Sequence, residues 1–215
     1  MKKMKNFVVF ALAAMVVASC GGGSDSSGKK LASNEFLGDL PNLVYQKMQS
    51  DSIRSAKEDA ATKDLKFTSE SDMKKAMALS EKFKEERNAT KEKFEAAVEA
   101  LKPSLVGKDI PVKVAEEAGY KITSCQIADV SGITVYVEFM LEVTDVKAIK
   151  TTYGGKDIIV SWQYLDKNDE QLGSNNTAYI ELSEKANGGT ASTKAVIHIG
   201  PNFVNFAKIN FIATN

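Results

Sequence analysis

The residues best suited to covalent chemistry are two cysteines, Cys20 and Cys125, and a single histidine, His198. Histidine can activate a cysteine as a catalytic nucleophile, and Cys125 and His198 both lie in strand-like sequence that could bring them together. No glycine-rich turn or helix start follows Cys125, although such surroundings are what lower the pKa of a thiol. We therefore expect Cys125 to be a buried structural residue, His198 to be half-exposed, and the chain to have no catalytic residues.

A single histidine also leaves few ways to build a metal site, because zinc sites draw on several histidine or cysteine ligands. Asp166, Asn168 and Glu170 have the alternating spacing with which an EF-hand calcium loop begins. That loop continues with glycine, where this chain has Gln171, and ends on glutamate, where it has Thr177. The sequence therefore predicts a plain hairpin turn here, with no metal ion and no other cofactor.

The chain has none of the spacings typical of phosphate-binding loops, dinucleotide-binding turns or serine hydrolases. Acidic residues for glycoside hydrolysis are plentiful, but Glu138 and Glu142 fall on the polar side of their predicted strand. The one tryptophan, Trp162, shares its spacing with core residues, whereas glycan-binding faces expose aromatic rings. These features favour a non-catalytic binding or scaffolding protein. The alternatives are a hydrolase, a glycan-processing accessory and a glycan-binding protein.

The first thirty residues have the pattern of a targeting segment. Three lysines within the first five residues precede an apolar run over residues 7–18. Crossing a bilayer core of about 30 Å takes roughly 20 helical residues, so this run is too short to span but suits a signal peptide. The run ends in small residues and Cys20, and the glycine- and serine-rich residues 21–30 follow.

The end of this run, Val17-Ala18-Ser19-Cys20, resembles the lipobox of bacterial lipoprotein precursors, although that family prefers leucine where Val17 stands. The resemblance implies that residues 1–19 are removed and that the Cys20 thiol receives a diacylglyceryl group. Two or three acyl chains hold a protein firmly at a membrane. In such lipoproteins of Gram-negative bacteria an aspartate after the cysteine signals retention in the inner membrane. This chain has Gly21 there, which favours the outer membrane.

Residues 20–34 are expected to form the lipidated cysteine and a flexible tether. Its glycine- and serine-rich part, ten residues long, has a root-mean-square reach of about 17 Å. The folded part would therefore stay close to the membrane. The alternative is an ordinary secretory signal cut near Ala18, which would leave Cys20 as an unexplained thiol in an oxidising compartment.

The mature chain has two parts that differ in composition. Residues 29–102 carry 15 basic and 14 acidic residues, whereas residues 103–215 carry 10 and 13. Glycine is absent from residues 39–106 and proline from residues 42–102, which favours long helices. The sequence therefore predicts a helical hairpin over residues 35–102, followed by a β domain over residues 103–215.

The hairpin is predicted to contain two helices joined by residues 62–68. Pro41 suits the first turn of a helix, where its missing N–H costs nothing, and this helix is expected to end near Ala61. Ser69 is a candidate N-cap with acidic residues just after it. A second helix is therefore expected over residues 71–101, about 46 Å long.

The second helix has a heptad-like seam that polar side chains interrupt. The seam comprises Ala76, Leu79, Phe83, Arg87, Thr90, Phe94, Ala97 and Leu101. It favours packing within the hairpin or on the β domain, and contact with a protein partner or a second copy of the chain is the alternative. The contact residues in that alternative would be Leu79, Phe83, Phe94 and Leu101.

Seven short strands are predicted in the β domain, separated by turn signals. They cover residues 109–114, 120–128, 132–144, 157–166, 176–183, 191–199 and 204–213. The clearest is 132–144, whose strict alternation predicts one buried and one exposed face. Its apolar face comprises Ile133, Val135, Val137, Phe139, Leu141 and Val143. In the next strand Ile158, Val160, Trp162 and Tyr164 share a face, and in the last Ala207, Ile209 and Phe211 do so.

Seven strands in about 105 residues match the pattern of an immunoglobulin-like sandwich. Residues 137–173 also look like small bacterial immunoglobulin-like domains attached to envelope lipoproteins, although the Cys…Trp…Cys framework of antibody domains is absent. The expected fold class is therefore α+β, with a helical hairpin followed by a seven-stranded immunoglobulin-like β-sandwich.

The charge balance bears on the choice of partner. The chain has 28 basic and 28 acidic residues, and removal of residues 1–19 takes three lysines and no acid, which leaves a net charge of −3. A slightly acidic protein does not suit nucleic-acid binding or electrostatic adhesion to a membrane. We therefore expect a cell-envelope protein that is held by its lipid and binds a protein partner or a second copy of itself.

Overall fold

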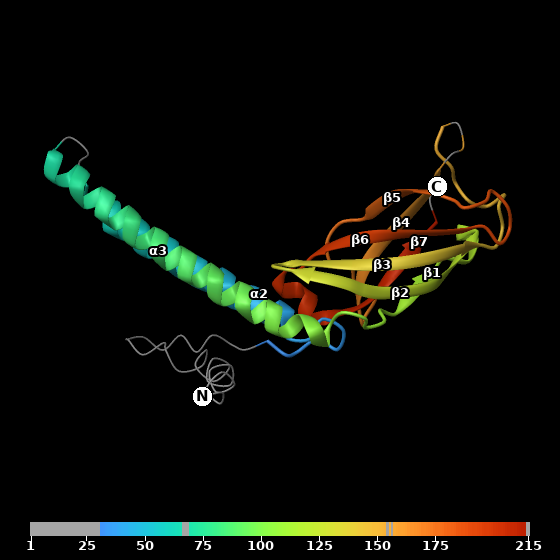
Figure 1. The fold of residues 1–215 in the computed structure, drawn as a ribbon, viewed down its shortest axis with the longest axis horizontal. Helices are drawn as coiled ribbons and strands as arrows, with labels where there is room; N and C mark the ends of the chain where they lie inside the picture. Colours follow the sequence, from blue (N-terminus) through green and yellow to red (C-terminus); the bar gives the residue numbers. More distant parts are fainter. Residues whose placement is uncertain (1–30, 66–68, 154, 156, 214–215) are drawn as a thin grey trace, which may run out of the picture.

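The computed structural model describes residues 31–65, 69–153, 155 and 157–213. The predicted signal peptide, Cys20 and most of the predicted tether lie outside these residues. The described chain has two long helices and seven strands in two sheets, so the α+β class is confirmed. The helices lie side by side as a long arm that extends from one end of the β domain (Figure 1). Within the described part of the chain, no helix combines the length and apolar character needed to cross a membrane.

The two helices of the arm begin and end close to where the sequence predicts. Helix α2 runs from Leu40 to Thr62 with proline in its first turn. Helix α3 covers Glu70–Leu101, and its 32 residues make it about 48 Å long. The Ser69 side chain accepts a hydrogen bond from the Asp72 backbone N–H at 3.0 Å, which confirms Ser69 as the N-cap.

The seven strands form a four-stranded and a three-stranded sheet. They are β1 (Val112–Val114), β2 (Tyr120–Ser131), β3 (Thr134–Val143), β4 (Asp157–Asp166), β5 (Asn176–Glu181), β6 (Thr190–His198) and β7 (Phe206–Ile212). The strand orders are β1-β7-β4-β5 and β2-β3-β6. Neighbouring strands are antiparallel except for β1 and β7, which are parallel.

The strand ends differ from the prediction by up to three residues, and two of these differences have a clear cause. Residues 109–111 do not belong to β1, because the chain just before β1 runs beside β2, where the Ile110 N–H donates to the Cys125 carbonyl at 2.9 Å. Ile133 is 42% exposed, although it was assigned to the apolar face of its strand. It lies in the two-residue turn between the paired Ser131 and Thr134, where the alternation of a strand no longer applies.

The core of the β domain lies between the two sheets. Phe139 on β3 contacts Trp162 on β4 and Phe211 on β7, with ring centroids 5.6 and 5.0 Å apart. The predicted apolar faces are buried on β3 from Val135 to Val143 and on β4 from Ile158 to Tyr164. Aromatic contacts that join two sheets in this way show that the sheets pack face to face.

The base of the arm shares this core. The buried cluster that contains the sheet residues continues through Leu40 and Val44 on α2 and through Phe94 and Val98 on α3. Val98 lies one position off the predicted seam and is buried because the end of α3 packs on β2 as well as on α2. An ion pair of 2.6 Å between Lys102 and Asp129 ties the end of α3 to β2. The helices therefore pack on one end of the β domain.

Candidate functional site

The structure keeps the two residues of the possible catalytic pair apart. Cys125 on β2 stands opposite Phe139 on β3, whereas His198 on β6 stands opposite Thr134, near the other end of β3. Five residues separate these positions along β3, or about 17 Å. Cys125 is buried in the core and His198 is exposed. The two side chains therefore cannot act together.

Burial raises the pKa of the Cys125 thiol to about 12, and the charge of Asp109 contributes in the same direction. At pH 8 roughly one such thiol in 10,000 is ionised. We predict that iodoacetamide leaves Cys125 unlabelled in a folded Cys20→Ala variant, where Cys125 is the remaining thiol, and labels it after unfolding in urea. Mass spectrometry measures the labelling, and rapid labelling of the folded chain would contradict the structural role.

The possible calcium-binding residues form the predicted turn. The buried Asp166 carboxylate accepts hydrogen bonds from the backbone N–H groups of Asn168 and Glu170, both at 2.8 Å. Asp169 within this turn has a φ of 65°, a left-handed conformation that aspartate tolerates. Asp166 thus stabilises the turn through the backbone. Among the described residues, no group of three or more His, Cys, Asp and Glu side chains could hold a metal ion.

The other residues considered for chemistry have structural positions. Trp162 is buried and donates a hydrogen bond from Nε1 to the Tyr164 hydroxyl at 3.0 Å. Glu138 is exposed on β3, and Glu142 forms an ion pair of 3.0 Å with Lys121 on β2. Neither carboxylate is buried.

The seam of α3 packs against α2 within the arm. Phe83 and Phe94 are buried, and Leu79 and Leu101 are half-buried, where α2 lies alongside α3 (Figure 1). The predicted packing within the hairpin is therefore confirmed. Phe83 and Phe94 consequently have little surface left for a partner.

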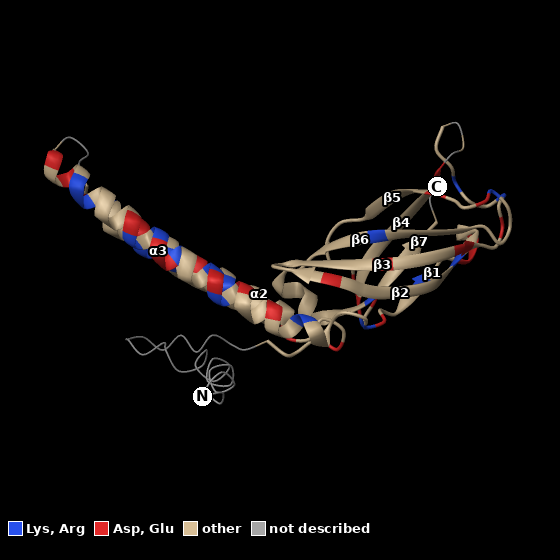
Figure 2. Ribbon diagram, viewed as in Figure 1, with Lys and Arg blue, Asp and Glu red and all other residues tan. Residues whose placement is uncertain are grey.

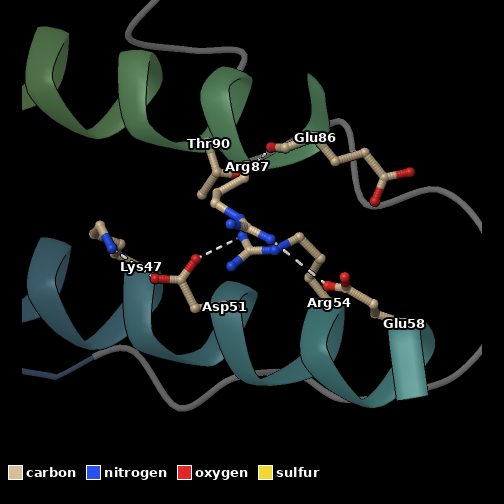
Figure 3. Close-up of polar contacts among 7 residues, drawn as sticks. All are labelled: Lys47, Asp51, Arg54, Glu58, Glu86, Arg87 and Thr90. Carbon is tan, nitrogen blue, oxygen red and sulfur yellow. Dashed lines mark hydrogen bonds and ion pairs between the residues drawn. The ribbon is translucent and has the colours of Figure 1, made fainter. Parts of the chain in front are cut away.

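The face that α2 turns towards this seam is polar beyond Val44. It presents Lys47, Asp51, Arg54 and Glu58, drawn in Figure 3. Asp51 forms ion pairs of 2.6 Å with both Lys47 and Arg54, and Glu58 reaches across to Arg87 on α3 at 3.7 Å. Of these ion pairs, only Glu58–Arg87 joins the two helices, because Lys47, Asp51 and Arg54 all lie on α2.

The charged groups of this cluster differ in how well they are paired. Burial by itself would raise the pKa of Asp51, but the hydrogen bonds and charges of Lys47 and Arg54 outweigh burial and hold it below its ordinary value. The Nε of Arg54 is buried and has no hydrogen-bond partner among the described residues. A groove of about 370 Å³ opens beside the cluster. Its lining residues are Lys47, Asp51, Arg54, Arg87, Lys91, Phe94 and Glu95.

Sequence reasoning identified Arg87 and Thr90 as a polar interruption but missed the α2 side of the cluster. The signal was present, because Lys47, Asp51, Arg54 and Glu58 follow helical spacing and alternate in charge. Thr90 is not a cross-helix partner, since its hydroxyl donates to the Glu86 carbonyl of its own helix at 2.8 Å. Thus only Arg87 of the predicted interruption joins the two helices.

The outer surface of the arm combines mixed charge with exposed apolar side chains. Basic and acidic residues alternate along it and are denser there than on the β domain (Figure 2). In the described part of the arm, the large apolar side chains that are exposed are Met48, Ile53, Met73 and Met77, of which Met77 is 72% exposed. The arm therefore has a polar groove between its helices and several exposed apolar side chains among the charges of its outer surface. No protein-family model, no curated protein and no solved structure matches this chain, so its function has to be inferred from this geometry.

Proposed function

We propose that the chain is a lipid-anchored cell-envelope protein whose helical arm is a non-catalytic binding or scaffolding surface for a protein partner. The observation that carries this proposal is the reach of the arm. Only its base packs on the β domain, where α2 meets Pro201–Asn205 and α3 meets β2. The remaining length extends away from the β domain (Figure 1). A helix of about 48 Å is far longer than is needed to cover one end of a small domain.

The apolar side chains on the arm support contact with a protein. Methionine is unbranched and polarisable, so it adapts to irregular partner surfaces. It is common on protein surfaces that bind several different partners. Among the described residues of the arm, three of the four exposed large apolar side chains are methionines, Met48, Met73 and Met77. The interspersed charges around them give a partner opportunities for rim contacts, which add specificity more than affinity.

The position of the first described residues supports an anchor at the base of the arm. Asn34 fixes the start of the described chain, because its side-chain amide donates to the carbonyls of Val204 and Phe206 at 3.0 and 2.7 Å. A lipid on Cys20 would be joined to this point through residues 21–33. Such a tether has a root-mean-square reach of about 20 Å. The arm and the β domain would then both extend from the point of attachment.

We also propose that the β domain is a variant of the immunoglobulin-like sandwich. Its division into four and three strands and its buried tryptophan at Trp162 agree with that fold. The parallel pairing of β1 with β7 departs from it, because immunoglobulin sheets are antiparallel.

The two cysteines allow a matched test of the lipid anchor. We predict that the Cys20→Ala variant leaves the membrane fraction of cells, whereas the Cys125→Ala variant stays there, because only Cys20 would carry the lipid. Fractionation and immunoblotting measure the distribution, and a density gradient separates outer from inner membrane. A Cys20→Ala variant still in the membrane, or a mature N-terminus without lipid by mass spectrometry, would contradict the proposal.

A further inference from the structure

We propose that the groove between α2 and α3 binds an oxyanion, either a phosphate or a carboxylate group, through Arg54 and Arg87. The site lies within the arm and does not depend on a protein partner. Arg54 on α2 and Arg87 on α3 line the same groove, and Figure 3 shows their guanidinium groups between the two helices. Two like charges that line one groove repel each other, and nearby anionic groups offset this repulsion.

The carboxylates already present in the arm offset this repulsion only in part. Asp51 is shared between Lys47 and Arg54, with both contacts at 2.6 Å. The ion pair between Arg87 and Glu58 is 3.7 Å long, which is beyond the range of a good hydrogen bond. A guanidinium carries five N–H donors, so most donors of Arg87 are free for a further acceptor.

The buried Nε of Arg54 points to a ligand independently of charge. A charged donor that is removed from water and left without an acceptor is unfavourable. This atom is the one buried side-chain donor in the arm that has no partner among the described residues. An oxygen acceptor in the adjacent groove would satisfy it.

The groove has the charge and the geometry for an oxyanion. Four cations, Lys47, Arg54, Arg87 and Lys91, face three carboxylates, those of Asp51, Glu58 and Glu95. Lys91 and Glu95 are 3.8 Å apart, so each carboxylate already has a cation and one positive charge is in excess. Arginine donors match the oxygens of phosphate and carboxylate in pairs. A volume of about 370 Å³ admits either group.

Nuclear magnetic resonance can follow the Arg54 Nε–H group directly in the ¹⁵N-labelled full chain, with the resonance assigned by its loss in Arg54→Lys. Sodium phosphate and sodium glutarate are each titrated against sodium chloride at equal ionic strength. We expect a saturable shift with phosphate or glutarate and none with chloride. The anion that saturates at the lower concentration identifies the group as phosphate or carboxylate. An equal shift with chloride, or no shift with any salt, would overturn the proposal.

Variants on α3 complete the test. Arg87→Gln should weaken binding about tenfold or more, because it removes a charge-assisted hydrogen bond. Arg87→Lys keeps the positive charge, so the arm should fold as before. It should nevertheless weaken binding, because lysine lacks the paired donors of arginine. Lys93→Gln, on the same helix but outside the groove, should leave binding unchanged. Unchanged affinity in both Arg87 variants would show that the groove is not the site.

Discussion

Replacing Phe211 by alanine is expected to lower the free energy of unfolding by about 4 kcal/mol. Phe211 on β7 is 0% exposed, and its ring contacts aromatic rings from both sheets. Its ring lies 5.0 Å from Phe139, 6.2 Å from Trp162 and 6.5 Å from Tyr120, measured between centroids. Alanine would remove these contacts and leave a cavity that the rigid strands on either side cannot close.

Urea unfolding followed by the fluorescence of the single tryptophan, Trp162, measures this loss. The control is a substitution of a large apolar residue by alanine at an exposed position, and Met77→Ala on the arm supplies it. Met77→Ala should change stability by less than about 0.5 kcal/mol. A loss below about 1 kcal/mol in Phe211→Ala would show that the sheets do not share the core described.

Replacing Asn34 by alanine is expected to cost about 3 kcal/mol and to loosen the base of the arm. The buried Asn34 amide donates to two carbonyls beside β7, while its oxygen accepts from the backbone N–H groups of Phe36 and Leu37, both at 2.9 Å. Alanine makes none of these four hydrogen bonds. It would leave buried donors and acceptors unsatisfied on both sides of the junction.

Hydrogen exchange measured by mass spectrometry separates this effect from a general loss of stability. We expect faster exchange in residues 35–44 of the Asn34→Ala variant and little change in β3, because the hydrogen bonds lost belong to the junction. Asn88→Ala is the matched control, since Asn88 is exposed on α3. Equal exchange in the two variants would contradict the role of Asn34.

Local signals account for the parts of the fold that the sequence predicted well. Helix α3 was predicted from its N-cap at Ser69, and that hydrogen bond is present. Strand β3 was predicted from strict alternation, and its apolar face from Val135 onward is buried. In both cases a residue and its near neighbours in the chain determine the structure, so spacing alone is sufficient.

The features that sequence reasoning missed depend on distant partners. The pairing of β1 with β7 joins Val112 to Ile209, and nothing in either segment specifies the other. Val98 is buried because β2 lies over the end of α3. The groove beside Asp51 and Arg54 also needs Arg87, which lies on the other helix (Figure 3). Spacing identified a charged helix face but did not show what lies opposite it.

The central claim is that the arm, and not the β domain, contacts a partner. A photo-crosslinking amino acid placed at Met77 on the arm tests it in intact cells, with the same substitution at Met140 on the outer face of β3 as control. Both side chains are exposed, by 72% and 44% respectively. We expect a protein adduct from Met77, either with another protein or with a second copy of the chain, and none from Met140. Adducts from Met140 with none from Met77 would contradict it.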